Sequence, residues 1–176
     1  MYDYILKHKL KSIYRKKSRE KHFLNWKDIR TVLVMFDIAH LDDVSVFIQQ
    51  IKKNGKKVTV CAYQTKDNTQ HYSTNDYFVI SKKEAGKWFG NPLHTIAKEL
   101  KKRPFDIVID LTLSCNIPLE YLLAHTPASV KAGFKKTDCS PYDLAITSLP
   151  LGEAESYQIN ELYKQIVYYL DRIGTG

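Results

Sequence analysis

Short, almost uninterrupted apolar runs alternate with helical patterns through most of this chain. Residues 31–36 and 105–111 are the clearest runs, and both are rich in β-branched side chains. A strand that is apolar on both faces is typical of a parallel sheet covered by helices on both sides. Shorter runs at 57–63, 77–80, 129–134 and 144–147 predict four more strands.

Helical spacing of apolar residues fills the segments between these strands. One such helix follows the first strand and ends at Asn54-Gly55, since glycine readily adopts the left-handed conformation of a helix stop. Pro92 and Pro118 stand where a proline can open a helix. A terminal helix spans 153–173. The alternation predicts a three-layer α/β fold of flavodoxin-like type, with a mostly parallel sheet and helices on both faces.

The charge lies almost entirely at the amino-terminal end. Residues 1–30 hold ten lysines and arginines against three acids, which accounts for seven of the formal net charge of +8. Apolar residues recur at three- and four-residue spacing, which predicts an amphipathic helix over 2–22. We therefore expect a basic leader (1–28), a single α/β domain (29–173) and a frayed end (174–176).

The leader has three open interpretations. A basic amphipathic helix can bind RNA or an anionic membrane surface. Alternatively, its apolar stripe packs on the domain and its cations face solvent, or the stripe forms a homodimer. The polyanion interpretation uses eight cations: Lys7, Lys9, Lys11, Arg15, Lys16, Lys17, Arg19 and Lys21.

Polar side chains follow three of the predicted strands. Because ligands of open α/β sheets bind outside the carboxyl ends of the strands, these residues would line a small-molecule pocket. The same residue types also cap helices in any fold of this kind. The polar residues are Asp37, His40, Asp42 and Asp43 after the first strand, Asp110, Thr112, Ser114, Cys115 and Asn116 after the fourth, and Lys135, Lys136, Thr137, Asp138 and Cys139 after the fifth. Our candidate ligand set is Asp37, Asp43, Asp110, Thr112 and Asn116.

Several chemistries lack their motifs. The loop after the first strand has no glycine, and no GxxxxGK[ST] or GxSxG is present, which disfavours dinucleotides, P-loop chemistry and a hydrolase elbow. The six histidines are scattered, and the three cysteines form no CxxC pair, so neither a zinc site nor a disulfide framework is predicted. We expect no cofactor and no metal, and we assign no catalytic residue. Without a signal peptide or a long apolar run, a cytoplasmic protein is expected.

Two resemblances add to this interpretation. Residues 105–111 (FDIVIDL) and 130–134 (VKAGF), with the segment from Val32 to Val44, resemble the amino-terminal domain of lipopolysaccharide heptosyltransferases. This implies half of a GT-B glycosyltransferase fold, with Asp43 at the position of the family's catalytic aspartate. Those enzymes bind the nucleotide sugar with a second domain, for which this chain has no room.

The whole chain more closely resembles an uncharacterised family of small Bacteroidota proteins. The shared features are the Lys-rich amino-terminal helix, Met35-Phe36-Asp37, Trp88-Phe89-Gly90, the strand at 105–111 and the segment Pro118-Leu119-Glu120-Tyr121.

The sequence thus predicts a non-catalytic binding or adaptor protein whose leader engages a polyanion. Such a protein would lie in the cytoplasm, peripheral to the inner membrane if the polyanion is a membrane. The alternative is a protein that binds a small ligand, either a nucleotide or a sugar, or a degenerate glycosyltransferase-like domain, at the strand ends.

Overall fold

The structure, a computed structural model, describes residues 10, 12, 21–65, 74–85, 92–136 and 141–173. Its strands are β1 (Thr31–Asp37), β2 (Lys57–Gln64), β3 (Tyr77–Ser81), β4 (Phe105–Asp110), β5 (Ala128–Phe134) and β6 (Leu144–Ile146). Its helices are the 3-10 turn η1 (Ile38–His40), α2 (Leu41–Lys53), α3 (Lys82–Ala85), α4 (Pro92–Lys101), α5 (Ile117–His125) and α6 (Glu155–Arg172).

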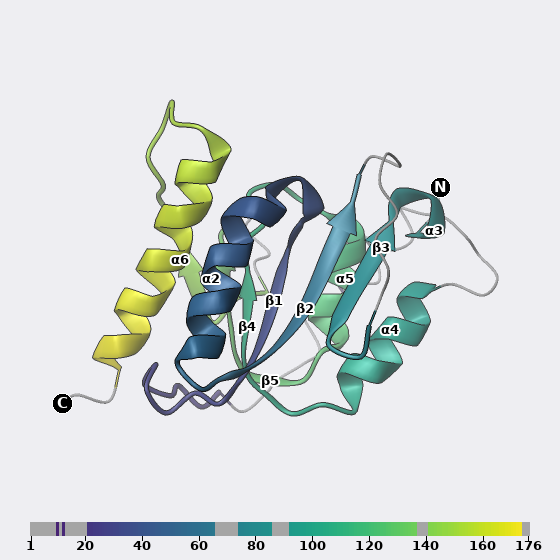
Figure 1. Ribbon diagram of the computed structural model, residues 1–176, viewed down its shortest axis with the longest axis horizontal. Helices are drawn as coiled ribbons and strands as arrows, with labels where there is room; N and C mark the ends of the chain where they lie inside the picture. Colours follow the sequence, from purple (N-terminus) through teal and green to yellow (C-terminus); the bar gives the residue numbers. More distant parts are fainter. Residues whose placement is uncertain are drawn as a thin grey trace.

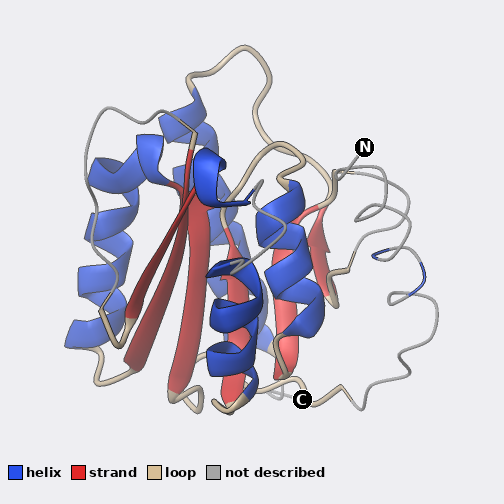
Figure 2. Ribbon diagram, turned by 90° about the vertical axis from the view of Figure 1, so that its right-hand side faces the viewer, coloured by secondary structure: helices blue, strands red, loops and turns tan. Residues whose placement is uncertain are grey.

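The six strands form one sheet in the order β3-β2-β1-β4-β5-β6, and each pairing between these strands is parallel. Helices cover both faces of the sheet, as Figures 1 and 2 show. The expected three-layer α/β fold is therefore confirmed. This 3-2-1-4-5-6 strand order is found in doubly wound α/β folds and differs from the flavodoxin order, in which β1 would lie between β2 and β3.

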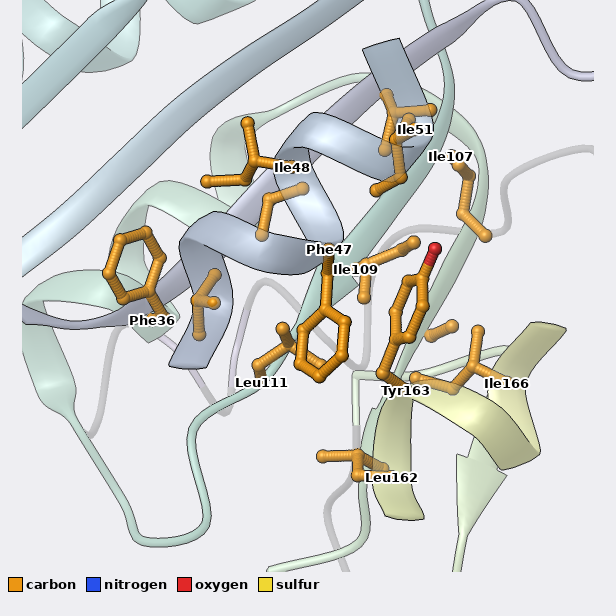
Figure 3. Close-up of a cluster of buried hydrophobic side chains, with 14 of the residues drawn as sticks. Phe36, Phe47, Ile48, Ile51, Ile107, Ile109, Leu111, Leu162, Tyr163 and Ile166 are labelled. Atoms are coloured by element: carbon orange, nitrogen blue, oxygen red, sulfur yellow. The ribbon is translucent and has the colours of Figure 1, made fainter. Parts of the chain in front are cut away.

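One core lies between the sheet and helices α2 and α6. Phe47 of α2 stacks on Tyr163 of α6 with ring centroids 4.4 Å apart, and both rings belong to the same buried cluster as apolar side chains of β1 and β4 (Figure 3). Ile107 and Ile109 of β4 lie in this layer and are fully buried. The one-sided apolar spacing of both helices therefore serves to cover this face of the sheet.

The second core lies on the opposite face, under α4 and α5. Leu33 and Met35 of β1 point into it, because alternate side chains of a strand face opposite sides of the sheet. Leu10 also belongs to this core and is only 3% exposed, whereas Ser12 is exposed; both residues are helical. At Leu10 the amino-terminal segment therefore contacts the domain.

The segment before β1 is tied to the end of the chain. The Asn25 side-chain amide donates to the carbonyls of Asp171 (2.8 Å) and Ile173 (3.1 Å), and the Trp26 N–H donates to the Leu170 carbonyl. Lys56 is buried beside Trp26, and its ammonium donates to the Trp26 and Ile29 carbonyls. Residues 25–29 thus pack on the α/β domain as part of its amino edge.

Candidate functional site

The sheet reverses its winding between β1 and β4. From β1 the chain proceeds through β2 to β3 on one side, and from β4 through β5 to β6 on the other. Helix α2 follows β1 on one face, and α5 follows β4 on the opposite face. In open α/β sheets, ligands bind outside the carboxyl ends of the strands at such a reversal. In Figure 1 the carboxyl ends of β1 and β2 lie at the upper edge.

Asp37 ends β1 and is held by two donors. Its Oδ1 accepts from the Ala39 N–H at 2.9 Å, which makes it the N-cap of η1, and its Oδ2 accepts from the Thr65 hydroxyl at 2.8 Å. Thr65 directly follows β2. The carboxylate is therefore fixed between two strand ends, and its remaining lone pairs can accept further hydrogen bonds.

His40 connects the loop after β1 with the start of α6. Its Nε2 lies 3.0 Å from Oε2 of Glu155, and its Nδ1 lies 3.9 Å from Oδ2 of Asp43. Asp43 and Glu155 are substantially exposed. The imidazole ring is thus within hydrogen-bond distance of Glu155, while the Asp43 carboxylate lies farther away on its other side.

A buried polar network follows β4 and β5. Asp110 is 1% exposed and accepts from the Thr112 hydroxyl (2.6 Å), the Thr112 N–H (2.9 Å) and the Tyr142 hydroxyl (2.6 Å). The Lys136 ammonium lies 3.0 Å from Asp110 Oδ2 and also donates to Thr112 and Tyr142. A buried charge persists only when it is paired and hydrogen-bonded, and this network meets both conditions for Asp110 and Lys136.

Two further residues are affected by this network, one through packing and one through its charge. Gly133 of β5 faces the Tyr142 ring so closely that a Cβ there would lie 2.6 Å from Cε1. Cys61 of β2 is fully buried; desolvation, and after it the Asp110 charge, raise the pKa of its thiol far above the usual value. Cys61 is therefore a core residue without thiolate chemistry.

The candidate ligand set is divided between these groups. Asp110 and Thr112 are hydrogen-bonded to each other, while Asp37 and Asp43 belong to the loop and helix after β1. Asn116 caps α5, where its Oδ1 accepts from the Leu119 N–H at 3.1 Å.

Of the partners of these residues, the sequence indicated His40 and Lys136 as strand-end residues, but not which groups they contact. Tyr142, Glu155 and Thr65 carry no local signal. Each becomes relevant only through residues that are distant in the chain.

Most of the basic leader falls outside the described residues, as do the Trp88-Phe89-Gly90 segment and Cys139. Of the eight proposed polyanion-binding cations, Lys7, Lys9, Lys11, Arg15, Lys16, Lys17 and Arg19 are in this group. Lys21 is described: its ammonium lies 3.6 Å from Oδ1 of Asp143 and is mostly exposed.

Two further observations concern the described part of the chain alone. Within it, no group of three or more His, Cys, Asp or Glu side chains is placed to hold a metal ion. No helix in these ranges has both the length and the apolar character that crossing a membrane requires.

Comparison with known proteins supports the fold. The chain is similar to a solved structure described as the glycosyl transferase family 9 from Veillonella parvula DSM 2008, with 21% identity and a TM-score of 0.52. The match covers 83% of this chain but only 42% of that one, so the chain spans less than half the length of the glycosyltransferase. No curated protein matches. A family model matches residues 3–173, and the chain therefore belongs to the family of unknown function DUF6913.

Proposed function

We propose that this protein binds a polyhydroxylated small ligand, a sugar or the sugar part of a nucleotide sugar, at the carboxyl edge of its sheet. The observation that carries the proposal is a set of carboxylates at the carboxyl edge of the sheet: Asp37, which accepts from Thr65 after β2, and Asp43 and Glu155, which both lie near His40. Carboxylates accept hydrogen bonds from hydroxyl groups, and such charge-assisted bonds are stronger than neutral ones.

The arrangement favours the sugar over the phosphate of such a ligand. Three carboxylates after β1 and at the start of α6 would repel a phosphate, and the loop after β1 has no glycine to let a phosphate approach the backbone. Lys136 is engaged with Asp110, so its charge is already balanced. The likeness to a glycosyl transferase agrees with a sugar ligand. We propose binding and assign no catalytic step to these residues.

A thermal-shift screen with free sugars, nucleotide sugars and nucleotides tests the proposal. A ligand present at 100 times its Kd stabilises the folded state by about 2.7 kcal/mol, which gives a clear rise in Tm. Asp43→Asn should weaken the affinity for the ligand found about tenfold or more, as loss of a charged hydrogen-bond acceptor does. Asp28→Asn, an exposed change at the opposite edge, is the matched control and should leave affinity unchanged.

The proposal is wrong if no sugar or nucleotide sugar shifts the Tm. It is also wrong if Asp28→Asn and Asp43→Asn weaken binding equally, because the carboxylate then acts only through net charge.

The amino-terminal segment supports a second candidate, in which the protein binds RNA through the eight cations named above. This candidate is supported by the seven net charges of residues 1–30, and by the burial of Leu10, which anchors their segment to the domain. Contacts with phosphates make affinity fall steeply with salt.

Fluorescence anisotropy of a labelled RNA at two salt concentrations tests this candidate. Replacing the eight cations by Gln should abolish binding, and unchanged binding would contradict it. If anionic vesicles bind the protein more tightly than the RNA and displace it, the segment binds a membrane surface instead. Light scattering distinguishes both from a homodimer.

A further inference from the structure

The amino edge of the sheet, opposite the proposed sugar site, contains a cavity of about 490 Å³. It opens where β1, β2 and β4 begin, and it lies about 20 Å from Asp37, given the rise of roughly 3.3 Å per residue along β1. Cavities of 300–1,000 Å³ are the size that small-molecule ligands use. Its lining is rich in donors and cations: Thr31, Lys57, Thr59, Asn75, Asp76, Lys102, Arg103, Pro104 and Phe105.

Arg103 is held in a fixed position in this cavity. Its guanidinium donates to Asp76 Oδ1 at 2.8 Å, to Thr59 Oγ1 at 3.4 Å and to the Asn75 carbonyl, and it lies over the Phe78 ring. A guanidinium has five N–H donors, of which three are used by described residues and two are not. These three bonds fix the orientation of the guanidinium before a ligand binds, so little side-chain entropy is lost on binding.

Two hydroxyl groups of the cavity also have donors left. Thr59 is only 2% exposed, and its Oγ1 accepts from Arg103; Thr31 Oγ1 accepts from the Asp106 N–H at 2.9 Å. Neither O–H has an acceptor within the described ranges. Such a hydroxyl can donate to water or to a ligand that brings an acceptor into the cavity. A ligand rich in oxygen acceptors would use both hydroxyls.

Among the described residues that line the cavity, three are cations and one is an acid: Lys57, Lys102 and Arg103, and Asp76. Arg103 is paired with Asp76, and Lys102 is paired with Glu99 of α4. The Lys57 ammonium has no ion pair in the part of the chain that is described, so it is the cation left to attract an anion.

The negative ends of two helix dipoles lie at this edge and disfavour an anion, but nearby lysines offset them. Helices α2 and α4 end at this edge, and each carboxyl end carries roughly half a negative charge. Lysines in their last turns offset it: Lys52, Lys53, Lys98 and Lys101. The nearby Asp106 carboxylate keeps its negative charge, and its Oδ2 accepts from the backbone N–H groups of Arg30 (2.7 Å) and Thr31 (2.9 Å).

We propose that this cavity is a second ligand site, which binds a phosphate monoester of about mononucleotide size. In this proposal the phosphate accepts hydrogen bonds from the two Arg103 donors that no described residue uses, from the Thr31 and Thr59 hydroxyls, and from the Lys57 ammonium. The rest of the volume, beside Pro104 and Phe105, holds the organic part. A phosphate uses charged and hydroxyl donors together, as in other phosphate sites.

Calorimetry with inorganic phosphate, adenosine 5′-monophosphate and adenosine tests the proposal on the full chain. We expect the monophosphate to bind more tightly than inorganic phosphate and adenosine not to bind. Lys57→Gln should weaken the affinity for the monophosphate about tenfold, as loss of a charged donor does. Thr59→Val, which removes the hydroxyl at nearly constant shape, should also weaken this affinity. Lys52→Gln makes the same charge change outside the cavity and should have less than a twofold effect.

The location is tested by amide chemical shifts. The monophosphate should move the signals of Thr59 and Phe105 and leave those of Asp37 and Thr112 unchanged. The opposite pattern overturns the site, as does the absence of saturable binding or equal effects of Lys57→Gln and Lys52→Gln. Equal affinity for inorganic phosphate and the monophosphate would contradict the proposal that the organic part occupies the volume beside Pro104 and Phe105. These outcomes are separated from the sugar site by Asp43→Asn, which should leave the affinity for the monophosphate unchanged, and by the signal of Asp37, which reports binding at that site.

Discussion

Lys136 Nζ lies 3.0 Å from Oδ2 of Asp110, although 26 residues separate them, and both side chains are almost completely buried. The pair lies at the carboxyl ends of β4 and β5 and is completed by the hydroxyls of Thr112 and Tyr142. A buried pair of this kind contributes little over a well-packed apolar pair, but removing one member leaves an unpaired buried charge.

We therefore expect Lys136→Met to destabilise the fold by about 3–5 kcal/mol, measured by urea unfolding. In the double variant with Asp110→Asn, the loss should be smaller than the sum of the two single losses, because no charge is left unpaired. Lys52→Met, at an exposed position, is the control and should cost less than about 0.5 kcal/mol. Strict additivity of the two changes would show that the ammonium and carboxylate do not interact.

Gly133→Ala should destabilise the protein by about 1–3 kcal/mol, as overpacking does. The new Cβ would lie 2.6 Å from Cε1 and 2.8 Å from Cζ of Tyr142, so the ring must move and its hydroxyl must leave Asp110. In a Tyr142→Ala background the same change should cost much less. Thermal unfolding of the four proteins measures the coupling, and an equal cost in both backgrounds would contradict the contact.

Leu10→Ala should cost about 2–5 kcal/mol, the usual range for a buried leucine. Leu10 is 3% exposed and packs in the core under α4 and α5, whereas Ser12 is exposed. Ser12→Ala is thus a control from the same segment and should change stability by less than about 0.5 kcal/mol. If both variants unfold at the wild-type urea concentration, the amino-terminal segment does not contribute to the core.

We expect the free energy of unfolding to decrease as pH rises from 10 to 12, because of the buried hydroxyl of Tyr163. Burial raises the pKa of Tyr163 from 10.0 to about 12, so in this window the unfolded state loses the phenolic proton while the folded state keeps it. The unfolded state then binds fewer protons, and the free energy of unfolding decreases with pH. Tyr163→Phe keeps the stacking on Phe47 and should show a shallower decline in urea midpoints between pH 9 and 12. Identical slopes would contradict the raised pKa.

Much of the fold could be predicted from local patterns. The strand expected at 31–36 forms at Thr31–Asp37, and the helix expected to end at Asn54-Gly55 ends at Lys53, with Gly55 at φ 76°. These elements are set by burial on one or both faces and by the conformational freedom of one glycine, which are properties of short segments. The same holds for Asn116, whose side chain caps the helix that follows it.

The sites required information that no short segment contains. Asp110 and Lys136 each follow a strand, which the sequence indicates, but they meet because β5 pairs with β4. Tyr142 reaches them through the segment that leads into β6. Arg103, Thr59 and Lys57 line one cavity because β1 lies between β2 and β4. The sequence alone thus determined the strands, the helices and their layered class, since these depend on local burial patterns. Only the tertiary structure decided the strand order and the partners of each polar group, because backbone pairing brings distant residues together.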